Sequence, residues 1–160
     1  MIQNILVPVD GSAHADRAVE LAADLADKYG GRLVLMHVLL SGHVPDEIRQ
    51  LSDKPGGEEP PMAVGAGYVE ASLPRDVLTD IAEKLLERAR ETAEGRGVTE
   101  VETCWRAGSV TERILEVAEE SGVDTVVLGS RGLSDLKGLL VGSVSHKIAH
   151  LFDGNVITVK

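Results

Sequence analysis

Residues 2–12, IQNILVPVDGS, decide the fold class of this chain. The run over 2–10 is short, apolar and rich in isoleucine and valine, which predicts a buried strand. It ends in a turn of Asp10, Gly11 and Ser12, and Ser12 is a preferred helix N-cap residue. The stretch therefore predicts a strand that passes directly into a helix.

The same strand-then-helix order continues along the chain. Apolar positions recur at helical spacing after Ser12 until Gly30 and Gly31 stop the pattern, and near-continuous apolar runs between the helices predict buried strands. Strict alternation of this kind predicts a parallel, doubly wound α/β sheet with right-handed crossovers. The expected helices cover 12–29, 74–94, 109–122 and 143–152, and the expected strands cover 2–10, 32–40, 98–107, 124–129 and 155–159.

Two stretches carry additional local signals. Residues 98–107 alternate between Val101, Thr103 and Trp105 on one face and polar residues on the other, which predicts a strand at a sheet edge. The sequence 109–112, Ser-Val-Thr-Glu, matches a helix capping box. Cys104 is expected to be a buried thiol on the first of these stretches.

The segment 41–74 interrupts the alternation. It holds five of the six prolines and five glycines, so neither a helix nor a strand can continue over any length. We expect one domain over 1–160 with a long flexible loop at about 41–74, covering one side of the site that lies beside it.

Composition limits the possible partners. The 160 residues carry a net charge of −10 and only 2% aromatic side chains, so neither nucleic acid nor anionic lipid is an expected ligand. No basic leader and no apolar stretch of about 20 residues is present, which predicts a cytoplasmic protein without membrane insertion. The single cysteine, Cys104, cannot form an intramolecular disulfide, in keeping with a reducing compartment.

The candidate site lies at the carboxyl ends of the expected strands, where parallel α/β sheets bind ligands. Gly129, Gly132 and Gly142 follow the spacing Gly-x2-Gly-x9-Gly, and Ser143 comes directly after. Glycines allow the backbone to approach a phosphate, and free amides at a helix N-terminus donate to it. We therefore expect Gly142, Ser143 and Ser145 to form a phosphate cradle.

Here the chain resembles the ATP-binding branch of the universal stress protein family, whose motif is Gly-x2-Gly-x9-Gly followed by Ser or Thr. The resemblance extends over nearly the whole chain, including ILVPVDGS and DTVVLGSRGLSDLKGLLVGSVS. It implies a Rossmann-like, adenine nucleotide α-hydrolase-like sheet with strand order 3-2-1-4-5. It also implies ATP, or AMP or ADP, as ligand with Mg²⁺ or Mn²⁺ bridging the phosphates. The nucleotide-binding residues that it implies are Pro8, Val9 and Val38 at adenine, Asp10 at the ribose or a metal-bound water, Gly129, Arg131 and Gly132 at ribose and α-phosphate, and Gly142, Ser143, Val144 and Ser145 at the outer phosphates.

Several of these residues also fit plainer roles. Asp10 could cap the first helix, Arg131 could be a solvated loop cation, and Gly129 and Gly132 could be ordinary turn glycines. His146, His150 and Asp153 could share one helix face as metal ligands, although histidines also suit the end of a helix for its dipole. No base is evident near Ser130, Ser143 or Ser145, so no catalytic residue is assigned.

Three function classes remain. The preferred one is a nucleotide-dependent regulator in the stress response, a homodimer joined through the strand 155–159, with at most slow ATP turnover. The alternatives are a nucleotide-hydrolysing or phosphoryl-transferring enzyme, for which Asp10 and Asp135 are the candidate carboxylates, and a protein-interaction partner of a transporter or kinase. The resemblance implies the dimer, but Gly154-Asn155 stands where the family often has Cys-Pro, and the protein partner is not evident.

Overall fold

A five-stranded parallel sheet forms the centre of the computed structural model, which describes residues 2–39, 46–54, 63–64, 67–68, 73–133 and 142–160. Its strand order is β5-β2-β1-β6-β7, and every neighbouring pair is parallel. Counted along the chain this order is 3-2-1-4-5, so the expected topology is confirmed. The strands are β1 (Asn4–Pro8), β2 (Arg32–Val38), β5 (Val101–Arg106), β6 (Thr125–Gly129) and β7 (Asn155–Val159).

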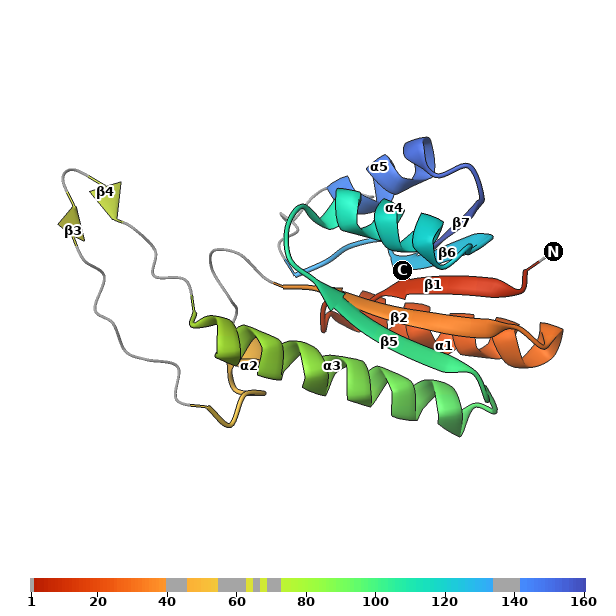
Figure 1. Cartoon of the computed structure of the whole chain (residues 1–160), viewed down its shortest axis with the longest axis horizontal. Helices are drawn as coiled ribbons and strands as arrows, with labels where there is room; N and C mark the ends of the chain where they lie inside the picture. The colour runs from red at the N-terminus through yellow and green to blue at the C-terminus, as the bar shows by residue number, and fades with distance from the viewer. Residues whose placement is uncertain (1, 40–45, 55–62, 65–66, 69–72, 134–141) are drawn as a thin grey trace.

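Helices cover both faces of this sheet (Figure 1). Helices α1 (Ala13–Tyr29) and α3 (Arg75–Gly95) lie on one face, and α4 (Val110–Glu120) and α5 (Ser143–Leu151) lie on the other. Each face has its own apolar core, one built around Ile5 and Leu33 and the other around Leu6 and Val34. The near-continuous apolar runs in β1 and β2 follow from this burial on both sides.

Helix α1 forms where its sequence signals predict. The Ser12 hydroxyl accepts a hydrogen bond from the Ala15 amide (3.2 Å), and Gly30 ends the helix in the left-handed region at φ 63°. A stripe of small side chains, including Ala18 and Ala22, lets the helix pack closely on the sheet. Helix α1 therefore begins after only four residues that follow the end of β1.

The capping box predicted for residues 109–112 does not form at the start of α4. Ser109 is the N-cap residue, as predicted, but its side chain makes no capping hydrogen bond. The helix is held instead by its buried stripe, which includes Ile114 and Val117. The start of α4 is therefore stabilised by packing and not by the capping hydrogen bond that the sequence predicts.

The segment 41–74 contains short elements in its described parts. These are α2 (Asp46–Arg49) and an antiparallel pair of β3 (Ala63–Val64) with β4 (Gly67–Tyr68). Much of the predicted loop lies outside the described residues, so its flexibility stays a prediction. The described helices include none with the length and apolar character that crossing a membrane requires.

Candidate functional site

The candidate site lies beyond the carboxyl ends of β1 and β6. From β1 the chain crosses to β2 on one side, whereas β6 lies on the other side, so the connections diverge between β1 and β6. Such a switch point leaves a crevice in which α/β proteins bind ligands. The left-hand end of the sheet in Figure 1 is this carboxyl edge, and the start of α5 borders it.

Asp10 joins the two loops that flank the crevice. Its Oδ1 accepts from the Ser12 amide (2.9 Å), and its Oδ2 accepts from the Leu133 amide (3.1 Å). Because Ser12 provides the capping hydroxyl, Asp10 is not itself the cap of α1. The carboxylate instead holds the turn after β1 against the loop after β6.

The motif glycines of this loop are required by close contacts. A side chain at Gly132 would place its Cβ 2.6 Å from Asp10 Oδ2. At Gly129 the Cβ would lie 2.9 Å from both the Arg131 carbonyl oxygen and His14 Cβ. The glycines are therefore more than turn-forming residues, because each admits a neighbouring group into the space that a side chain would fill.

Ser130 has a histidine neighbour that the sequence does not reveal. His14 Nδ1 lies 3.2 Å from the Ser130 hydroxyl, so the expectation that no base faces this serine is wrong. The two residues are far apart in the chain, and only the packing of α1 against β6 brings them together. With an exposed fraction of 3%, however, the Ser130 side chain is poorly placed to attack a bound ligand.

The start of α5 offers main-chain donors. The first intrahelical bond runs from the His146 amide to the Gly142 carbonyl (3.1 Å), so the amides of Ser143, Val144 and Ser145 precede the helical hydrogen-bond pattern. The Gly142 amide is already used, because it donates to the Ser130 carbonyl (2.6 Å). Three successive amides and the helix dipole thus suit an anion at this point.

The predicted cradle residues do not all face outward. Ser143 is exposed and Val144 is half-buried, whereas Ser145 is buried. The Ser145 hydroxyl donates to the Gly142 carbonyl (2.9 Å) and lies 3.4 Å from the Ser130 carbonyl. Its side chain therefore braces the turn, and its amide is the group left for a ligand.

The ends of β1 and β2 form the apolar side of the site. Val9 and Val38 are buried, and the Val9 amide donates to the Met36 carbonyl (2.7 Å). His37 is also buried, and its Nδ1 lies 2.7 Å from the Val9 carbonyl. Since a carbonyl only accepts, Nδ1 carries the proton. Burial lowers the pKa of His37, and the Val9 carbonyl and the Asp10 charge offset this only in part, which keeps the ring neutral.

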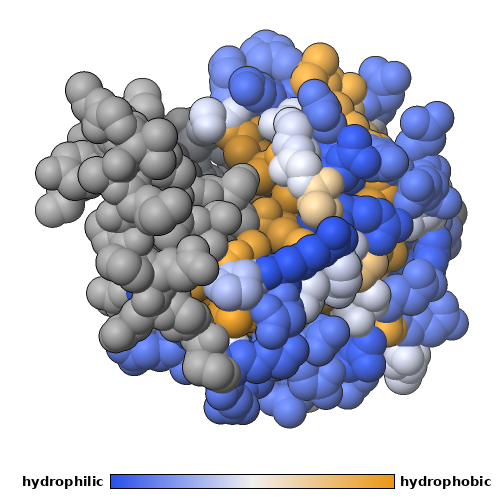
Figure 2. Space-filling model, turned by 60° about the vertical axis from the view of Figure 1, so that its left-hand side comes forward, coloured by the Kyte–Doolittle hydropathy of each residue, from blue (hydrophilic) through white to orange (hydrophobic). Residues whose placement is uncertain are grey.

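The remaining predicted residues also lie at this edge. Pro8 ends β1, and Arg131 lies partly exposed in the loop after β6. Figure 2 brings this side of the molecule forward and shows hydrophobic side chains gathered in the middle of the face beside hydrophilic ones.

The possible metal ligands on α5 and directly after it do not form a group of three. The His146 and His150 rings are in edge-to-face contact, with centroids 4.6 Å apart, and both side chains are exposed. Within the described ranges no three His, Cys, Asp or Glu side chains are grouped to hold a metal ion, so Asp153 does not complete a site. Asp135, the second candidate carboxylate, lies outside the described residues.

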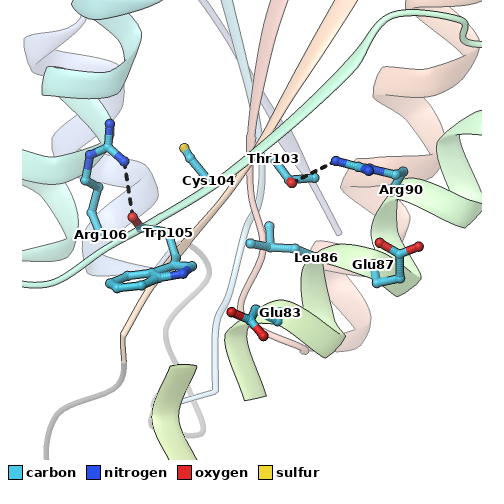
Figure 3. Close-up of a pocket in the computed structure, with 8 residues that line it drawn as sticks. All are labelled: Glu83, Leu86, Glu87, Arg90, Thr103, Cys104, Trp105 and Arg106. Carbon is cyan, nitrogen blue, oxygen red and sulfur yellow. Dashed lines mark hydrogen bonds between the residues drawn. The ribbon is translucent and has the colours of Figure 1, made fainter. Parts of the chain in front are cut away.

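A separate pocket of about 440 Å³ lies beside the edge strand β5, between this strand and α3 (Figure 3). Arg90 extends from α3 and donates to the Thr103 hydroxyl (2.9 Å), and Arg106 donates to the Trp105 carbonyl (3.2 Å). Cys104 is half-buried here, less than expected, and burial raises the pKa of its thiol. The strand is an edge strand, as its alternation predicts.

A family model and the curated relatives of this chain indicate the same protein family. The universal stress protein family model matches residues 1–160. The chain is 31% identical to universal stress protein YxiE of Bacillus subtilis, with both chains covered completely, and 30% identical to a Thermus aquaticus universal stress protein over 92% of this chain and 91% of the relative.

Solved structures have the same fold. That of hypothetical protein MJ0577 superposes with a TM-score of 0.73 at 25% identity, covering 100% of this chain and 96% of the other. A universal stress protein in complex with cAMP has a TM-score of 0.64 at 23% identity, covering 99% and 96%. An Archaeoglobus fulgidus universal stress protein in complex with dAMP has a TM-score of 0.64 at 21% identity, covering both chains fully. With its fold, its glycine motif and a family match over its whole length, this chain belongs to the universal stress protein family.

Proposed function

We propose that this chain is a cytoplasmic ATP-binding regulator of the stress response, with its nucleotide site at the carboxyl edge of β1, β2 and β6. The observation that carries the proposal is the loop after β6. Gly129 and Gly132 leave no room for a Cβ, and the loop is fixed both to Asp10 and to the start of α5. A loop built so tightly beside a helix N-terminus is a site for phosphate.

The apolar end of the crevice would hold the base. Pro8, Val9 and Val38 lie at the ends of β1 and β2, and a buried, neutral His37 fixes the Val9 carbonyl. Apolar walls with a few fixed polar groups are typical of sites for flat ligands. We assign the adenine ring to this wall.

The polar end would hold the ribose and phosphates. Asp10 would contact the ribose or a metal-bound water, and Gly129, Arg131 and Gly132 would lie along the ribose and α-phosphate. The outer phosphates would take the amides of Ser143, Val144 and Ser145. Gly142 would contribute close backbone approach, since its own amide is bonded to Ser130.

A divalent cation would need the phosphates of the nucleotide as ligands to bind at this site. Both Asp10 oxygens already accept main-chain hydrogen bonds, which leaves lone pairs for a water-mediated contact but no cluster of carboxylates. Mg²⁺ keeps several waters and binds readily through phosphates. Mg²⁺ or Mn²⁺ would therefore bridge the phosphates and neutralise their charge, which matters in a chain of net charge −10.

The relatives support an adenine nucleotide. Solved universal stress proteins with this fold are complexes with cAMP and dAMP. Both ligands share the adenine base and a phosphate with ATP, AMP and ADP. The three amides at the start of α5 favour the longer phosphate chain of ATP over a monophosphate.

Regulation fits the residues better than rapid catalysis. His14 is the base nearest to Ser130, but that serine is buried and hydrogen-bonded on every side. Asp10 is held by two amides. Neither arrangement presents an activated group to the phosphates, so we expect turnover far below the typical enzyme value of about 10 s⁻¹.

The two edges of the sheet support a homodimer through β7. At β5, the Arg106 guanidinium caps the Trp105 carbonyl and α3 lies alongside, a form of edge protection. At β7, Val156 and Ile157 are half-buried and Thr158 is exposed. Alternate residues of β7 direct their main-chain groups away from β6, which leaves an edge that a second copy could pair with.

Nucleotide released from gently purified protein tests the proposal. We expect mass spectrometry to find ATP, or its product ADP, at close to one molecule per chain, and calorimetry to show that the emptied protein takes ATP up again in the presence of Mg²⁺. A protein that is purified empty and gives no heat with ATP, ADP or AMP would favour the interaction-partner function.

A further inference from the structure

Ser130 is a buried residue at which several parts of the site meet. Its amide donates to the Val159 carbonyl at the end of β7 (2.7 Å), and its carbonyl accepts from the Gly142 amide at the start of α5 (2.6 Å). Its hydroxyl lies 3.2 Å from Nδ1 of His14, in the first turn of α1. One residue thus connects two helices and a strand.

His14 reaches Ser130 from a rigid element. The next residues of α1, including Ala15 and Ala18, are buried against the sheet, so the first turn is firmly placed. Gly129 allows the approach, because a Cβ there would lie 2.9 Å from His14 Cβ. A side chain on a packed helix gives the loop a fixed reference position.

We propose that His14 and Ser130 form a positioning pair, which holds the loop after β6 and the start of α5 in their nucleotide-binding arrangement before the nucleotide arrives. The inference rests on the proposed function. Because Ser130 is buried, it acts through main-chain bonds to its neighbours and not by touching ATP. Holding a loop in place beforehand removes part of the ordering cost of binding.

Matched variants of His14 separate this role from simple space filling. His14→Asn keeps a hydrogen-bonding atom at the δ position, whereas His14→Gln moves it one atom further out. Ser130→Ala removes the hydroxyl and keeps the main chain. If the two residues act as a positioning pair, His14→Asn should behave like the wild type. His14→Gln and Ser130→Ala should both loosen the loop after β6.

The first measurement is amide hydrogen exchange by NMR in the ligand-free protein. We expect the amides of residues 130 and 142, corrected for intrinsic rates, to exchange roughly fivefold faster in His14→Gln and Ser130→Ala than in the wild type, the change expected for about one hydrogen bond. Equal rates in all four proteins would overturn the proposal.

The second measurement is ATP affinity by calorimetry. His14→Gln and Ser130→Ala should each weaken binding roughly fivefold, and the double variant should be no weaker than either, because both changes break the same contact. Losses that multiply, or a lowered melting temperature with unchanged affinity, would contradict a positioning pair. A wild type that binds no ATP would defeat the proposed function, while the exchange rates would still decide whether the pair holds the loop.

Discussion

At the scale of single residues, the site depends on glycines that admit a neighbour. Gly132 leads to a direct prediction, since a Cβ there would lie 2.6 Å from Asp10 Oδ2. Gly132→Ala should push Asp10 off the Leu133 amide and weaken ATP binding about tenfold or more, as expected when a hydrogen bond to a charged group is lost. Titration calorimetry measures this. Gly95→Ala is the control, because a Cβ at Gly95 meets nothing within 4 Å, and equal affinity in both variants would exclude this role.

His37 makes stability depend on pH. Its folded pKa lies below the ordinary value of 6.5, so the unfolded chain binds the proton first. The stabilisation is therefore complete above pH 6.5 and is lost as the pH falls below it towards the folded pKa. His37→Asn keeps a donor for the Val9 carbonyl without titrating in this range. Urea unfolding at pH 7 and pH 5 should show a smaller loss of free energy in the variant, whereas an identical loss would contradict a neutral buried His37.

Residue patterns in the sequence identify Gly129, Gly132 and Gly142, because their spacing is local and regular. They do not identify His14 as the partner of Ser130, since 116 positions separate the two and only the packing of α1 against β6 joins them. Nor do they show that the Ser145 hydroxyl braces its own turn. The role of a serine hydroxyl depends on which groups the fold places beside it, and the sequence pattern does not give those neighbours.

At the scale of elements, Asp124 ties the amino end of β6 to β1. Burial acts to raise its pKa, but hydrogen bonds from the Thr125 hydroxyl and the amides of Asn4 and Gln3 outweigh it and leave the pKa lowered. The carboxylate thus stabilises the fold above its ordinary pKa of 3.8, and this is lost as the pH falls through the folded value. Asp124→Asn should cost about 2 kcal/mol at pH 7 by chemical unfolding, with the difference from the wild type shrinking on acidification. A constant difference across pH would refute the assignment.

The edge strand β7 gives a prediction about assembly. The Asn155 amide and the Val159 carbonyl bond towards β6, so the alternate Thr158 directs its amide outward. Thr158→Pro should leave β7 on the sheet but remove a donor from the open edge, giving a folded monomer by analytical ultracentrifugation. Thr158→Ala, which keeps the amide, should remain a dimer. A dimeric proline variant would place the interface elsewhere, with the β5 edge the next surface to test.

Element boundaries follow the sequence closely where caps and glycines mark them. Helix α1 starts and ends within a residue of its signals, while β1 is shorter at both ends than the apolar run 2–10. The run continues past the strand because Val9, which follows β1, is buried in the same hydrophobic core as Ile5 and Val7, and its amide still donates to the Met36 carbonyl of β2. Hydrophobic residues mark burial, and here the core extends one residue beyond the end of the strand.

At the scale of the molecule, the doubly wound order follows from the alternation of strands and helices, and the family match agrees with it over the full length. The sequence predicts that the loop after β6 lies at the site, but not its hydrogen bonds to Asp10 and to the start of α5. These contacts depend on which strand lies beside β1. That neighbour is set by crossovers on opposite sides of the sheet, a property of the whole chain.

ATP is proposed to bind at the carboxyl edge of β1 and β6. Titration of ¹⁵N-labelled protein with ATP and Mg²⁺, followed by NMR, tests it most directly. We expect saturable shifts at the amides of Gly129, Gly132, Ser143 and Val144, with the pocket between α3 and β5 unaffected. Shifts confined to Thr103 and Trp105, or no shifts at millimolar ATP, would contradict it.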